Sequence, residues 1–269
     1  MLINLPFFKV MFKQQRNTVL KISGGIVLYE QLLTWVYPAI SKTPAVTEIV
    51  DSFPSAVKTV FGVSANARTD TFEAYLCSQF FARIWTMLMA LYGINSANAL
   101  LSKLVEDGSL AFPLSAPISR SRVLTTQAAV LFVNNGLLIT MTFLGLFLGT
   151  RVFGIMIDKT PYRHFFFLSL SFFSVISSYS LLFSTLAEKE KSLAYAYGLT
   201  FIFYVLDVLA GLSEQLSWMG NLSLFRLLKP QEVLEGTIKP TGIFIGLSLS
   251  ACLLLYLAVR VFEKKDLPL

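Results

Sequence analysis

Long hydrophobic runs, separated by short polar stretches, dominate the sequence. A helix needs about 20 mainly apolar residues to cross the hydrocarbon core of a membrane. Six runs satisfy this requirement: residues 22–40, 79–101, 128–150, 165–186, 193–212 and 242–262. The pattern therefore predicts an all-α membrane protein in which residues 1–269 form one transmembrane domain of six helices.

Six spans place both termini on the same side of the membrane, and the basic residues indicate which side. With the N-terminus inside, the inner segments carry 12 Lys and Arg residues and the outer segments carry nine. Short cytoplasmic segments of membrane proteins carry an excess of Lys and Arg. We therefore expect a multi-pass protein of the plasma membrane with both termini in the cytoplasm.

Residues 1–21 precede the first run and carry basic residues at helical spacing. One helical face would carry Lys9, Lys13 and Arg16, and the opposite face would carry apolar side chains. This pattern is typical of an amphipathic helix that lies in the membrane interface. The alternative is an ordinary basic flank of the first span.

The composition excludes several classes of protein. The chain is 55% hydrophobic and 14% charged, whereas about a quarter of the residues of a soluble domain are charged. Basic loops that face anionic lipid explain the net charge of +6, so we expect membrane lipid and no nucleic acid as a partner.

The sequence has no pattern typical of a metal site, because its metal-binding residue types are few and far apart: Cys77, Cys252 and the single histidine, His164. We expect no metal site and no cofactor in this chain.

Two longer segments, residues 41–78 and 213–241, are expected on the outer side. Both carry clustered apolar residues and are expected to fold onto the outer membrane surface. In the second segment, Pro230 follows the apolar residues Leu224, Phe225, Leu227 and Leu228.

Small residues spaced four apart indicate where two membrane helices approach closely. Gly145 and Gly149 form one such pair, and Gly242, Gly246 and Ser250 form a longer row on the last span. We interpret both as candidate helix-packing faces. The alternative is that glycine is simply common in membrane helices.

Three ionisable residues fall inside the predicted spans. Glu30 lies in the middle of the first span, and Arg83 and Asp207 lie in the outer parts of the second and fifth. Such a residue costs several kcal/mol at this depth unless it is paired or faces water. Arg83 and Asp207 have similar depths and could form an ion pair. The alternative is that these residues line a translocation path.

Catalytic motifs are absent from the sequence. A phosphate-binding loop has the pattern G-x-x-x-x-G-K-[ST], and the nearest string, Gly154 to Thr160, lacks the glycine before its lysine. The G-x-S-x-G motif of serine hydrolases does not occur. We therefore expect that the chain is not itself an enzyme.

A polar and basic stretch, residues 101–123, interrupts the apolar runs between the second and third spans. It reads EDGSL from Glu106 to Leu110 and PLSAPISR from Pro113 to Arg120. These residues resemble the E-x-G-T-L and P-[VI]-S-R motifs of ABC-2 type permeases, the membrane subunits of ABC exporters. The C-terminal FEKKDL, residues 262–267, resembles the F-x-[RK]-[RK]-D-L end of the same family.

The resemblance implies a six-span permease domain without a nucleotide-binding domain. It also implies that residues 101–123 contain a cytoplasmic coupling helix that docks on a separate ABC ATPase subunit, which would bind ATP and Mg²⁺. A second permease copy, either the same chain or a paralogue, would complete the transporter. The sequence departs from the family pattern at Asp107, Ser109 and the Phe112–Pro113 pair. The residues that the resemblance assigns to ATPase docking are Glu106, Asp107, Gly108, Leu110, Pro117 and Arg120.

The apolar and aromatic spans favour an amphiphilic cargo, such as a hydrophobic or antimicrobial peptide or a lipid-linked molecule. Only the resemblance implies export. One alternative is an ATP-independent secondary transporter or channel, whose usual mark is a pair of inverted repeats with broken helices. Another is a membrane immunity or resistance protein that transports nothing. Residues 101–123 could also be an ordinary cytoplasmic loop.

Overall fold

The computed structural model describes residues 3–40, 71–108 and 118–265. These residues form helices and no strands. The long helices are α1 (Leu5–Ile40), α5 (Thr86–Leu100), α8 (Arg120–Val152), α9 (Lys159–Leu186), α10 (Lys189–Leu212) and α12 (Thr241–Lys264). The shorter elements are α4 (Phe72–Leu76), η1 (Cys77–Trp85), α6 (Ser102–Glu106), η2 (Glu214–Leu222), η3 (Phe225–Leu227) and α11 (Pro230–Leu234).

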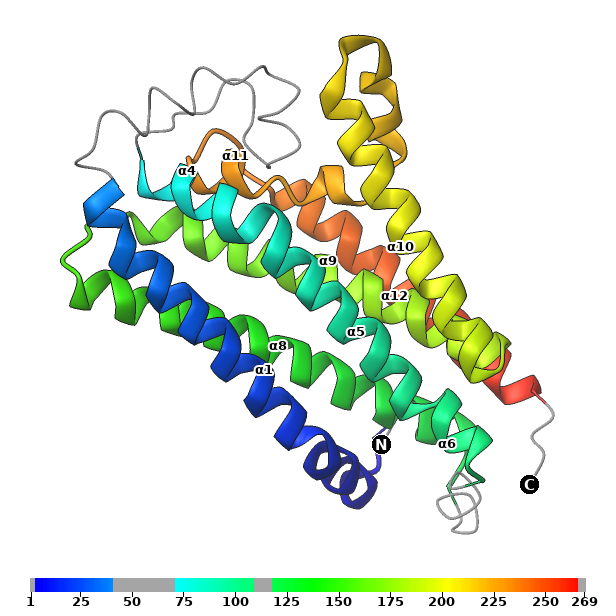
Figure 1. The fold of residues 1–269 in the computed structure, drawn as a ribbon. Coiled ribbons are helices and arrows are strands. Elements are labelled where there is room, and N and C mark those ends of the chain that lie inside the picture. Colours follow the sequence, from blue (N-terminus) through cyan, green and yellow to red (C-terminus); the bar gives the residue numbers. More distant parts are fainter. Residues whose placement is uncertain (1–2, 41–70, 109–117, 266–269) are drawn as a thin grey trace.

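The long helices form an elongated bundle in which both ends of the described chain lie at the same end (Figure 1). We call this end, which carries Leu5, Glu106, Arg120 and Lys264, the terminal end. The opposite end, where α1 finishes and α12 begins, is the distal end. The first and last described helices therefore begin and end at the same end of the bundle, and the cytoplasmic location of the termini stays a prediction.

Helix α9 lies at the centre of the bundle, with α5, α8, α10 and α12 packed against it, while α1 packs along α8. Aromatic side chains fill much of the core. The Trp85 ring meets Phe81 and Phe173 edge to face, with ring centroids 5.2 Å apart in each pair. Such pairs each stabilise a core by about 0.5–1.5 kcal/mol beyond the apolar area that they bury.

Each of the six predicted runs lies within helical structure, but most of these helices begin several residues earlier than predicted. Within the described ranges, five helical segments are long and apolar enough to cross a membrane: Phe72–Glu106, Arg120–Val152, Lys159–Leu186, Lys189–Leu212 and Thr241–Lys264. The first run, residues 22–40, lies in α1, which is not among these five. A multi-pass membrane protein is supported, and the sixth span stays a prediction.

The separate interfacial helix expected for residues 1–21 is not seen as an independent element. Helix α1 continues from Leu5 to Ile40, and its first turns curve away from the axis of the remainder (Figure 1). Its 36 residues extend about 54 Å at 1.5 Å per residue, which exceeds the membrane core of about 30 Å. A single helix can therefore contain both a spanning part and a part outside the hydrocarbon core.

The predicted second span contains an irregularity that its sequence did not indicate. Residues Cys77–Trp85 form a π-helix between α4 and α5, and the Thr86 hydroxyl donates a hydrogen bond to the Phe81 carbonyl at 2.5 Å. Wider π-helical turns are rare and often occur at functional sites. Arg83, one of the predicted ionisable residues, lies in this segment.

The expectation for residues 213–241 is wrong in one respect. Phe225 and Leu228, predicted to rest on the membrane surface, are buried in the core of the protein. They belong to η3 and the turn before α11, which contacts α9, α4 and η1 at the distal end. Most of the earlier segment, residues 41–70, lies outside the described residues.

The first predicted glycine pair is confirmed as a packing face. A Cβ atom at Gly145 would lie 2.8 Å from a carboxylate oxygen of Glu30, and one at Gly149 would lie 2.7 Å from the side-chain oxygen of Gln31. Real Cβ atoms essentially never approach other atoms so closely. Glycine at these two positions therefore permits the close approach of α1 to α8.

The longer row on α12 packs against no part of the described chain. Gly242, Gly246 and Ser250 are exposed, and a Cβ atom at either glycine would meet nothing within 4 Å. The expectation of a helix-packing face is therefore not met within a single described chain.

Candidate functional site

The four predicted ATPase-docking residues that the structure describes lie at the terminal end, but the first three end a helix instead of starting one. Glu106 is the last residue of α6 and Asp107 follows as its C-cap. Gly108 has a φ of +67°, in the left-handed region that glycine adopts readily. Leu110 and Pro117 lie outside the described residues, so the predicted coupling helix stays a prediction.

Glu106 connects this helix end to the turn between α9 and α10. Its carboxylate lies 3.5 Å from the amine of Lys189, the first residue of α10. Asn98 donates a hydrogen bond to the backbone carbonyl of Lys189 at 3.1 Å. Both ion-pair partners are substantially exposed, and such a pair contributes about 0–1 kcal/mol. The contact therefore positions the end of α6 beside the start of α10 and adds little to the free energy of unfolding.

Arg120 connects the start of α8 to the end of α12. Its guanidinium donates a hydrogen bond to the backbone carbonyl of Lys265 at 2.5 Å. The neighbouring Ser121 hydroxyl donates to the carboxylate of Glu263, which also lies 3.6 Å from the guanidinium of Arg260. The two stretches that carry the family resemblance, 145 residues apart in sequence, thus meet in space. Sequence reasoning missed this contact because nothing local to either stretch specifies its partner.

Glu30 is fully buried where α1 packs against α8. Neither carboxylate oxygen has a hydrogen-bond partner among the described residues. The adjacent Gln31 donates from its amide to the Gly145 carbonyl at 2.7 Å, which ties α1 to α8 at this level. Glu30 therefore lies inside the interface between these two helices, and its predicted place on a translocation path is untested.

Arg83 contacts Tyr204, which lies on the same helix as Asp207 in the distal half of the bundle. The Arg83 guanidinium donates to the Tyr204 hydroxyl at 2.6 Å and lies 5.5 Å from the centre of its ring. Tyr204 is one helical turn before Asp207. Arg226, Arg83 and Lys229 are cations close enough for their charges to reach Asp207. A direct ion pair between Arg83 and Asp207 stays a prediction.

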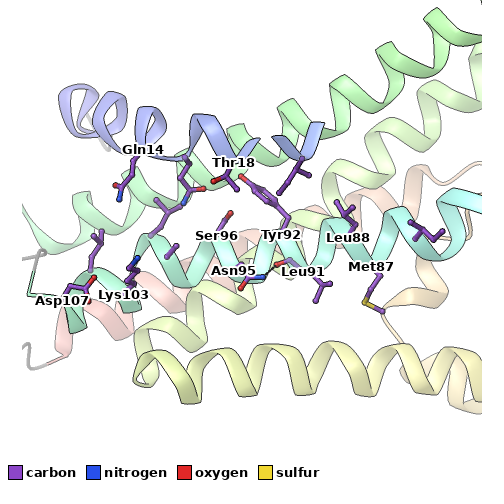
Figure 2. A pocket seen from close by; sticks show the side chains of 16 residues that line it. Gln14, Thr18, Met87, Leu88, Leu91, Tyr92, Asn95, Ser96, Lys103 and Asp107 are labelled. Carbon is purple, nitrogen blue, oxygen red and sulfur yellow. Dashed lines mark hydrogen bonds between the residues drawn. The ribbon is translucent and has the colours of Figure 1, made fainter. Parts of the chain in front are cut away.

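A cavity of about 880 Å³, which the sequence did not predict, lies between α1 and the α5–α6 segment. Figure 2 shows Gln14 and Thr18 of α1 on one side and Tyr92, Asn95 and Ser96 of α5 on the other. No motif could have identified it, because its polar residues are scattered over two helices that the sequence does not pair.

Comparison with known protein families gives one match. Residues 31–267 match the family described as ABC-2 family transporter protein. No curated protein matches the sequence. The matched range extends from the second half of α1 through α12, so it includes every element of the terminal end that follows α1.

Proposed function

Because this chain belongs to the ABC-2 family of transporter proteins, we propose that it is the membrane subunit of an ATP-driven exporter of amphiphilic molecules. A separate ABC ATPase subunit would bind ATP and Mg²⁺ and dock at the terminal end, which would face the cytoplasm. A second permease copy, identical or paralogous, would complete the translocation path.

The observation that supports this proposal is that the described residues on either side of the segment between α6 and α8, Glu106 and Arg120, each contact another long helix or its end. Glu106 contacts Lys189 at the start of α10, and Arg120 contacts Lys265 at the end of α12. A partner that pushes on this segment would therefore move α5, α8, α10 and α12 together. Packed helices transmit such a displacement as rigid bodies.

The exposed row on α12 supports a second copy. Gly242, Gly246 and Ser250 leave a flat strip on that helix, and small residues four apart are typical of close helix pairs in membranes. In a homodimer, a helix of the second copy would pack against this strip, which no described residue of the single chain covers.

Site-specific photo-crosslinking tests the docking surface and its orientation together. A photoreactive amino acid would replace Glu106 at the terminal end or, as a matched control, Met156, which is 98% exposed at the distal end. In cells that contain the cognate ATPase subunit, we expect crosslinks to that subunit from position 106 and none from position 156. Crosslinks from position 156 alone would refute the proposed orientation. Crosslinks from neither position would favour a secondary transporter, a channel or a non-transporting membrane protein.

A further inference from the structure

The cavity between α1 and α5 changes character along its length (Figure 2). Toward the distal side, its lining is apolar and includes Ile84, Leu88 and Leu91. Toward the terminal end, the lining becomes polar and then charged, with Lys103 and Asp107 at its edge. An amphiphile whose tail lies in the membrane and whose head group lies at the surface has the same order of chemical groups.

The two charged residues at the edge are available to a ligand. Lys103 lies in α6 and Asp107 follows one turn later, so both side chains occupy the same side of the segment. Neither forms an ion pair with another residue in the part of the chain that the structure describes. An ammonium beside a carboxylate matches a head group that carries one phosphate and one amine.

The deeper wall holds a buried hydroxyl. Tyr92 is only 4% exposed, and Figure 2 shows its side chain directed from α5 toward α1. Its hydroxyl lies near the side chains of Ser96 and Asn134, and no hydrogen bond of ordinary geometry joins it to them within the described ranges. A buried hydroxyl is stabilised by a well-placed acceptor. The ester carbonyl at the head of an acyl chain would be such an acceptor at this depth.

We infer that this groove binds a zwitterionic phospholipid-type amphiphile, with its acyl chain between α1 and α5 and its head group between Lys103 and Asp107. The phosphate contacts the Lys103 ammonium, the amine contacts the Asp107 carboxylate, and the Tyr92 hydroxyl donates to the glycerol ester region. The cavity volume of about 880 Å³ is within the range of about 300–1,000 Å³ for small-molecule sites. That the bound molecule is cargo rests on the proposed function, whereas the binding itself does not.

The test is competition binding on the purified full chain in detergent. The probe is lysophosphatidylethanolamine with a fluorescent acyl chain, displaced by unlabelled lysophosphatidylethanolamine or by lysophosphatidylglycerol, which lacks the amine. We expect the zwitterionic lipid to displace the probe at lower concentration. Lys103→Gln should weaken binding of both lipids, and Asp107→Asn should weaken only the zwitterionic one. Tyr92→Phe should weaken both about 2- to 10-fold, the range for one lost hydrogen bond.

Two exposed residues near the same end provide matched controls for charge. Lys9→Gln and Glu188→Gln remove one cation and one anion without touching the cavity, so both should leave the binding unchanged. Equal displacement by the two lipids, or equal weakening by the control variants, would overturn the inference.

A second copy of the chain is the competing occupant of the groove. The exposed native cysteine is first removed by Cys252→Ser, and a single cysteine is then placed in the groove by Asn95→Cys. If lipid fills the groove, the introduced thiols of two copies should not form a disulfide in a lipid membrane. Rapid disulfide formation between two copies would show that the groove is a protein interface and overturn the inference.

These experiments distinguish a failure of the lipid-binding inference from a failure of the proposed transport function. If the predicted binding pattern is seen but the lipid does not stimulate ATP hydrolysis by the assembled transporter, the cargo role is refuted and the site stands. If no ATPase subunit associates with the chain, the proposed function fails while the binding result keeps its meaning.

Discussion

Replacing Arg120 tests how the terminal end is held together. Its guanidinium is the only described group that joins the first turn of α8 to the Lys265 carbonyl. A hydrogen bond from a charged donor contributes about 1.5–3 kcal/mol in a buried setting. Arg120 is partly exposed and the Ser121–Glu263 contact remains in place, so solvent reduces the expected loss to about 1 kcal/mol.

The assay is thermal unfolding of the purified chain in detergent. A loss of about 1 kcal/mol lowers the melting temperature by about 2–4 °C in a chain of this size. Arg122→Gln is the matched control. Arg122 lies two residues after Arg120 and carries the same charge, and its side chain has no described partner. A Tm for Arg120→Gln that equals that of Arg122→Gln would refute the structural role of Arg120.

The same variant has an expected effect on coupling. Removing one of the two described hydrogen bonds between the start of α8 and the end of α12 should leave basal ATP hydrolysis by the assembled transporter in place. The increase in hydrolysis caused by cargo should fall in part, because only the Ser121–Glu263 hydrogen bond still joins the first turn of α8 to the end of α12. Retention of the full cargo-dependent increase would contradict this account of force transmission.

Two further predictions concern the helix interfaces. Gly145→Ala should destabilise the chain by about 1–3 kcal/mol, because its Cβ would lie 3.0 Å and 3.3 Å from the two methyl groups of Val27 as well as 2.8 Å from a Glu30 oxygen. Gly136→Ala, whose Cβ would make only an ordinary 3.8 Å contact, should be neutral or stabilising by up to about 1 kcal/mol. Equal thermal shifts for the two variants would contradict the packing. Arg83→Gln and Asp207→Asn should be non-additive in a double-mutant cycle of unfolding free energies, with a coupling of about 0.5–3 kcal/mol. Additive losses would show that the two residues do not act together.

The sequence predicted the helices well, because each long apolar run has one favourable state in lipid. In hydrocarbon, the backbone of such a run must satisfy its own hydrogen bonds, so it forms a helix wherever it lies. The pair Gly145 and Gly149 was predictable for a similar reason, since close helix approach leaves a local pattern of small residues. The continuity of α1 was less predictable: one helix runs from Leu5 through the predicted run to Ile40, where a separate interfacial helix was expected before residue 22.

The role of the candidate docking residues stays a prediction, and their local structure was only partly predictable. Glu106, Asp107 and Gly108 are adjacent in sequence and lie at one helix end, but they end α6, whereas the sequence predicted that they start a helix. The contact of Arg120 with Lys265 depends on how α8 and α12 pack, and no local pattern encodes it. Burial of Phe225 and Leu228 also escaped prediction, because an apolar cluster near a membrane surface can face either lipid or the protein core.

The most direct test of the central claim is a gentle-detergent purification of the tagged chain from its native host, followed by identification of the co-purifying proteins and an ATPase assay. The account predicts an ABC ATPase subunit at roughly equal stoichiometry and ATP hydrolysis by the complex. Recovery of the chain alone, with no nucleotide hydrolysis, would contradict it.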